Sequence, residues 1–162
     1  MRRGRHTFRP GMVMPEIAEP FILLIEDNKP DVYLVRKSLQ EHGISHELRV
    51  VRDGEEALRF IAEIGGANPC PALVLLYLNL PRVDGREILY RLRANPQASL
   101  VPVIAMSSSD SPADRTAIIQ LGARAYFRKP PDLDQFMRLG RVVTEVLAEA
   151  PEQRTSRGTL GV

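Results

Sequence analysis

The sequence predicts an α/β protein, a single domain with a doubly wound five-stranded parallel sheet covered by helices on both faces. Short apolar runs alternate along the chain with segments whose apolar residues recur at helical spacing. Most of these runs are apolar throughout, which is typical of parallel strands buried on both faces. The chain has 162 residues, of which 44% are hydrophobic, so it is about one domain long and can bury a core.

The first two strands enclose a helix. The run FILLIE at 21–26 is apolar until it reaches two acids, so we expect a strand there. Residues 30–41 carry apolar side chains at helical spacing, with Asn28 or Asp31 as the cap. Residues 47–51 alternate apolar and polar side chains, which predicts the second strand.

The third and fourth strands follow the same alternation. Asp53 is positioned to cap a helix that ends near Gly65. The apolar run from Leu73, LVLLYLNLP, predicts a buried strand that ends near Tyr77 at a turn. Asp84 opens the next helix, and VPVIAM at 101–106 predicts the fourth strand.

The end of the chain completes the pattern. Ser111 and Pro112 begin a helix, and AYFR at 125–128 is a short fifth strand. Asp132 caps one last helix with a continuous apolar face. We therefore expect five strands and five helices in alternation.

Charge and composition separate the ends from the body. A basic excess lies in an N-terminal arm, residues 1–20, and in a polar tail, residues 149–162, both expected to be disordered. Residues 21–148 form the predicted domain and are nearly neutral. The single cysteine, Cys70, excludes an internal disulfide and fits a reducing compartment. No apolar run is long enough to span a membrane, so we expect a cytoplasmic protein.

Polar side chains follow the predicted strands at one edge of the sheet, where sites of open parallel sheets lie. The first strand is followed by Glu26 and Asp27, the third ends near Asn79, the fourth is followed by Ser107, and the fifth by Lys129. An acid pair suits Mg²⁺. A hydroxyl and an ammonium suit a phosphoryl group.

With these residues the chain resembles the receiver domain of two-component response regulators, the chemotaxis-type regulatory module. The resemblance covers about residues 21–147. It is carried by ILLIEDN at 22–28, LNLPRVDG at 78–85, IAMSSSD at 104–110 and GARAYFRKP at 122–130. The motif PRVDG at 81–85, and the loop before the third strand, are most similar to those of small stand-alone receivers that partner phytochrome-type sensor kinases.

The resemblance implies a flavodoxin-like sheet with strand order 2-1-3-4-5. It also implies a role for each matching position, which we take as expectations. Glu26 and Asp27 would hold Mg²⁺, with a backbone carbonyl from Asn79. Ser107 would be the switch hydroxyl and Lys129 would contact the phosphoryl group. Tyr126 would be the aromatic switch residue, and Pro130 would follow a cis peptide bond.

One position departs from the family pattern. Tyr77 stands where the resemblance places the phosphate-accepting aspartate, and the neighbouring motif residues allow no shift of register. A phenol, with a reference pKa of about 10, is about 0.1% ionised at pH 7, whereas a carboxylate is fully ionised. With one carboxylate lost, Mg²⁺ should bind more weakly, and Lys129 is expected to pair with Asp27 instead. The ring either turns inward and fills the pocket or turns outward and is exposed.

Three functions remain open. The first is a pseudo-receiver that works without phosphorylation, through protein–protein interaction. The second is a conventional receiver whose acceptor is altered in this sequence or replaced by another residue. The third is an enzyme on the same fold that uses Asp27, Lys129 and the serines. We expect the first, and so no catalytic activity.

The expected partner is a protein. The resemblance implies an output face made by the last helix, the fifth strand and the fourth helix. Through it the chain would bind a sensor histidine kinase, another regulator or its own copy as a homodimer. No segment of this sequence predicts a DNA-binding module, and the terminal arginines alone are weak evidence for one.

Overall fold

The computed structural model of the protein describes residues 19–149 and contains one five-stranded parallel sheet. The strands are β1 (Phe21–Ile25), β2 (Glu47–Val51), β3 (Leu73–Tyr77), β4 (Val103–Ser107) and β5 (Ala125–Arg128). Their order across the sheet is β2-β1-β3-β4-β5, and every neighbouring pair is parallel. The predicted fold class and strand order are therefore confirmed.

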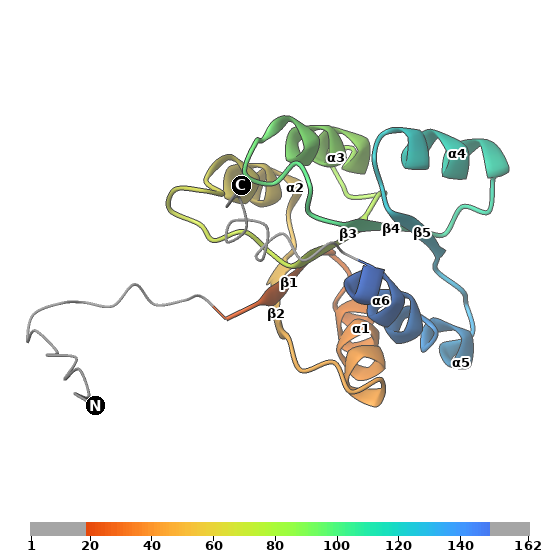
Figure 1. Cartoon of the computed structure of the whole chain (residues 1–162). Helices are drawn as coiled ribbons and strands as arrows, with labels where there is room; N and C mark the ends of the chain where they lie inside the picture. Colours follow the sequence, from red (N-terminus) through yellow and green to blue (C-terminus); the bar gives the residue numbers. More distant parts are fainter. Residues whose placement is uncertain (1–18, 150–162) are drawn as a thin grey trace, which may run out of the picture.

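Helices cover both faces of this sheet (Figure 1). They are α1 (Lys29–Glu41), α2 (Gly54–Ala62), α3 (Gly85–Ala94), α4 (Pro112–Gln120), α5 (Leu133–Phe136) and α6 (Leu139–Glu149). Helices α2, α3 and α4 lie on one face, and α1, α5 and α6 lie on the other. The predicted helix caps Asn28, Asp53, Asp84, Ser111 and Asp132 each accept a hydrogen bond from a backbone N–H of the first turn.

Two hydrophobic clusters, one on each face, hold the helices to the sheet. Alternate residues of β1 point to opposite faces, with Leu23 in the first cluster and Leu24 in the second. All five residues of β1, and all but the last of β3, are buried. This explains why both strands appear in the sequence as continuous apolar runs.

Helix α4 is held less firmly than its neighbours. Ile118 is its buried residue, whereas Ile119 and the following Leu121 are about 40% exposed. The helix has little apolar periodicity, so its attachment to the first cluster rests mainly on one side chain.

The fourth strand begins two residues later than predicted. Pro102 has no N–H to donate to the ladder, although its carbonyl accepts a hydrogen bond from the Val74 N–H at 3.0 Å. The strand therefore runs from Val103 and includes Ser107, which places the Ser107 hydroxyl directly at the edge of the sheet.

The predicted last helix is divided into α5 and α6 because Ser38 of α1 inserts into its hydrogen-bond ladder. The Ser38 hydroxyl donates to the Met137 carbonyl at 2.8 Å and accepts from the Gly140 N–H at 2.8 Å. Both backbone groups are thereby diverted from partners within a continuous helix. Ser38 is fully buried, so α1 and α6 are joined by polar contacts inside the core.

Arg93 of α3 connects two loops at the edge of the sheet opposite the predicted site, the α3–β4 loop and the α4–β5 loop. Its guanidinium donates to the carbonyls of Ser99 at 3.0 Å, Val101 at 2.8 Å and Gly122 at 2.7 Å. Burial lowers the pKa of this guanidinium from its usual value. The side chain therefore supplies hydrogen bonds for carbonyls in the loops that precede β4 and β5.

We expect Arg93→Met to lower the free energy of unfolding by about 2–3 kcal/mol, because three carbonyls lose charge-assisted hydrogen bonds. Urea unfolding followed by circular dichroism measures this loss. Arg91→Met, on the exposed side of the same helix, is the matched control and should change stability by less than about 0.5 kcal/mol. Equal stability of the two variants would contradict the proposed role of Arg93.

No helix within residues 19–149 is long and apolar enough to cross a membrane. The predicted N-terminal arm and C-terminal tail fall almost entirely on residues 1–18 and 150–162, outside the described part of the chain.

Candidate functional site

Polar side chains from four strands reach one edge of the sheet, as predicted. Glu26 and Asp27 follow β1, Tyr77 ends β3, Ser107 ends β4 and Lys129 follows β5. The parallel sheet places the carboxyl ends of these strands side by side. Their contacts divide them into two groups, one centred on Lys129 and one centred on Ser107.

The Lys129 ammonium contacts three side chains from three elements. Its Nζ atom donates to Glu26 Oε2 at 2.6 Å and to Asp31 Oδ2 at 2.7 Å. It also lies 3.5 Å from the centre of the Tyr77 ring, over the face of the ring. Two carboxylates and an aromatic face therefore surround one cation that is largely, but not fully, buried.

The predicted pairing of Lys129 with Asp27 is wrong. Asp27 is exposed, whereas Asp31 lies one turn into α1 and projects toward the end of β5. From the sequence, Asp31 is expected only as a helix cap. Its position four residues after Asp27, at the start of a helix that follows the rim, is the signal that could have identified it.

Glu26 carries the only charge in the described core that is completely inaccessible to solvent. Burial raises the pKa of this carboxyl, while the ion pair with Lys129 acts in the opposite direction. Its second oxygen, Oε1, accepts a hydrogen bond from the Asn28 N–H at 3.3 Å. Both oxygens of the carboxylate are thus already engaged by donors of the protein itself.

Tyr77 is half-buried and packs against both hydrophobic clusters. Its ring lies beneath the Lys129 ammonium, so the side chain is part of the pocket rather than an aromatic group projecting into solvent. Of the two arrangements that the sequence allowed, the structure has the one in which the ring turns inward.

The two carboxylates predicted to hold Mg²⁺ do not converge in this arrangement. Glu26 faces Lys129, whereas Asp27 is exposed. Within residues 19–149, no three His, Cys, Asp or Glu side chains are grouped so that they could hold a metal ion. A divalent cation that used Glu26 as a ligand would compete with Lys129 and the Asn28 N–H for the carboxylate oxygens.

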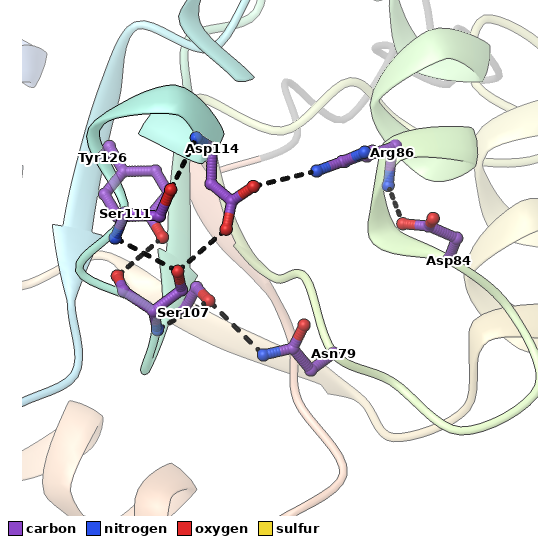
Figure 2. A network of polar contacts seen from close by, with 8 residues as sticks. Asn79, Asp84, Arg86, Ser107, Ser111, Asp114 and Tyr126 are labelled. Atoms are coloured by element: carbon purple, nitrogen blue, oxygen red, sulfur yellow. Dashed lines mark hydrogen bonds and ion pairs between the residues drawn. The ribbon is translucent and has the colours of Figure 1, made fainter. Parts of the chain in front are cut away.

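The second group centres on Ser107 (Figure 2). The Ser107 hydroxyl accepts hydrogen bonds from the Asn79 side-chain amide at 3.3 Å and from the Ser109 N–H at 3.2 Å. Asn79 thus reaches the site through its side chain. Ser107 is almost completely buried, so its hydroxyl is held in one place by the two loops that follow β3 and β4.

Tyr126 joins this group through the backbone and not through Ser107. Its hydroxyl donates to the Ser109 carbonyl at 2.9 Å, and the ring is half-buried beside α4 (Figure 2). The two predicted switch residues are therefore linked indirectly, through the loop residue Ser109.

Ser109 also connects the site to α3 and α4 through contacts that the sequence does not predict. Its hydroxyl donates to Asp114 at 2.8 Å, and Asp114 lies 3.6 Å from the Arg86 guanidinium across the cleft between the helices (Figure 2). The Asp114 N–H donates to the Ser111 hydroxyl at 3.3 Å. The stretch Ser-Pro-Ala-Asp at 111–114, which has the spacing of a capping box, is the signal that could have revealed Asp114.

The prediction of a cis peptide bond before Pro130 is wrong. No peptide bond within residues 19–149 is cis. The trans form is favoured by about 0.5–1 kcal/mol for a bond that precedes proline. The Lys129 N–H donates to the Ser107 carbonyl with an N–O distance of 2.7 Å, which continues the pairing of β4 with β5.

The fold and this edge of the sheet define a class of protein. The model of the response regulator receiver domain family matches residues 22–139. The chain belongs to this family, and its function lies in two-component signal transduction.

Its relatives include regulators of phytochrome signalling. The chain is 38% identical over 120 residues to the response regulator Rcp1 of Synechocystis sp., covering 73% of this chain and 82% of the relative. The phosphorylated cyanobacterial phytochrome response regulator RcpA superposes with a TM-score of 0.71 at 32% identity, covering 82% of this chain and 96% of that one. The Mn²⁺-bound form of Rcp1 gives a TM-score of 0.71 at 34% identity, with coverages of 80% and 95%.

Proposed function

We propose that this protein is a phosphorylation-independent receiver, a pseudo-receiver that acts in the cytoplasm by binding another protein and catalyses no reaction. The observation that carries the proposal is Tyr77. It lies at the end of β3, where the family resemblance places the acceptor aspartate, with its ring under the Lys129 ammonium. A protonated phenol in this position is a poor nucleophile for a phosphoryl group.

Two further features support the proposal. The two predicted phosphate-contacting groups are engaged by the protein, Lys129 by Glu26 and Asp31, and Ser107 by Asn79 and Ser109. Any Mg²⁺ affinity would be weak, since Glu26 is paired with Lys129 and Asp27, the other expected carboxylate ligand, is exposed and does not join it. The site is therefore better suited to a fixed conformation than to a switch driven by phosphate.

The partner would bind the face made by α4, β5 and α6. Ile119 and Leu121 expose apolar surface at the end of α4, beside this face. A sensor histidine kinase, another regulator and a second copy of the chain are the candidate partners. Cross-linking and capture with purified kinase would distinguish them.

Incubation with acetyl phosphate and Mg²⁺, followed by intact mass measurement, tests the proposal. We expect no added phosphoryl group. A mass increase of one phosphoryl group that hydroxylamine removes would show an acyl phosphate and contradict the proposal. That outcome would support the alternative, a conventional receiver that uses a substitute carboxylate, of which the exposed Asp27 is the first candidate. The phosphorylated state of the relative RcpA makes this control necessary.

A further inference from the structure

The group around Lys129 has the composition of an occupied cation site. It contains two carboxylates, Glu26 and Asp31, the electron-rich face of Tyr77, and one ammonium in contact with all three. The Lys129 side chain is only 10% exposed, and that of Glu26 is 0% exposed. The cation and its principal anion are therefore both removed from water.

A buried carboxylate requires a positive charge beside it, because an unpaired charge in the core is strongly destabilising. Lys129 supplies that charge at 2.6 Å from Glu26 Oε2, while the Asn28 N–H engages Oε1. A lysine ammonium is a compact point charge with three donors. Two of these donors reach the carboxylates, and the Tyr77 ring adds a cation–π contact.

We propose that the Lys129 ammonium is the resident cation of this pocket and excludes a divalent metal ion from it. A divalent ion that took Glu26 as a ligand would have to compete for the oxygens that Lys129 and Asn28 already engage. It would also carry two positive charges to within a few ångströms of a third. The inference extends the proposed function, since it rests in part on Tyr77 standing where a third carboxylate would be.

Titration with Mn²⁺, followed by the electron paramagnetic resonance signal of the free ion, tests this inference. Lys129→Met removes the ammonium and leaves both carboxylates, so it should bind Mn²⁺ at least about tenfold more tightly than the wild type. Lys37→Met, which removes one lysine of α1 away from this group, is the matched control and should behave as the wild type. Equal Mn²⁺ affinity of the wild type and Lys129→Met would overturn the inference.

A second measurement on the wild type decides the matter if Lys129→Met does not fold. The chain has three lysines, Lys29, Lys37 and Lys129, whose acylation rates can be compared by peptide mass spectrometry. We expect Lys129 to react most slowly, and an excess of Mg²⁺ to leave its rate unchanged. Faster acylation of Lys129 in Mg²⁺ would show that the metal displaces the ammonium, and would overturn the inference.

Different experimental results would overturn the pseudo-receiver and the resident cation. Tight Mn²⁺ binding by the wild type, without formation of an acyl phosphate, would overturn the resident cation and leave the pseudo-receiver intact. Formation of an acyl phosphate would overturn the pseudo-receiver whatever the affinity for metal.

Discussion

Tyr77→Asp is expected to convert the protein into a phosphate acceptor. The substitution places an ionised carboxylate at the end of β3, beside Glu26 and Lys129, and removes the ring that fills the pocket. At pH 7 the ionised, nucleophilic fraction of residue 77 is about a thousandfold larger for the aspartate than for the tyrosine. The new carboxylate also gives Lys129 a third anionic partner and gives a metal ion an additional ligand.

The measurement is the initial rate at which acetyl phosphate adds one phosphoryl group, in the presence of Mg²⁺. Tyr77→Asn is the matched control, because it removes the same ring and has nearly the shape of aspartate but offers no carboxylate. We expect a hydroxylamine-sensitive adduct on Tyr77→Asp alone. If Tyr77→Asp stays as inert as Tyr77→Asn, the identity of residue 77 is not what prevents phosphorylation.

Gly140→Ala should destabilise the fold more than any other single methyl addition at a described helix–helix contact. A Cβ at this position would lie 2.5 Å from the Ser38 carbonyl oxygen and closer still to the His42 ring. The backbone oxygen cannot move without shifting α1, and the Ser38 hydroxyl would lose its hydrogen bond from the Gly140 N–H. The expected loss is about 3 kcal/mol, which lowers Tm by about 10 °C.

Thermal unfolding followed by circular dichroism measures this effect. Gly66→Ala is the matched control, since a Cβ there would meet its nearest neighbour, the Glu63 carbonyl oxygen, at 3.6 Å, an ordinary contact. It should stay within about 0.5 kcal/mol of the wild type. A Gly140→Ala protein that melts with the wild type would show that α1 and α6 can separate at little cost.

The strands and helix caps could be predicted because their signals are local. A buried parallel strand must be apolar on both faces. A cap such as Asp53 lies within two residues of the N–H group from which its side chain accepts a hydrogen bond. The start of β4 was misplaced because the apolar run of residues 101–106 hides the effect of Pro102 on the ladder. That effect depends on which neighbour the strand pairs with.

The parts that were missed depend on contacts between distant segments. Ser38 interrupts the last helix although it lies 99 residues away in the sequence. The apolar periodicity of α1 and of the last helix does not indicate this contact. Asp31 reaches Lys129 across 98 residues, because α1 begins beside the end of β5. The rim residues themselves were found because parallel strands place their carboxyl ends together. Which rim residue contacts which depends on side-chain directions that spacing does not give.

The buried contact of Ser38 with α6 has a mechanical consequence. It makes α1 and α6 one stiff unit, whereas α4 is anchored to the sheet mainly through Ile118. The two layers of helices therefore differ in stiffness. Displacing α4 from the sheet should require less free energy than separating α1 from α6. A partner that binds across α4 would therefore deform this side of the protein more easily than the side formed by α1 and α6.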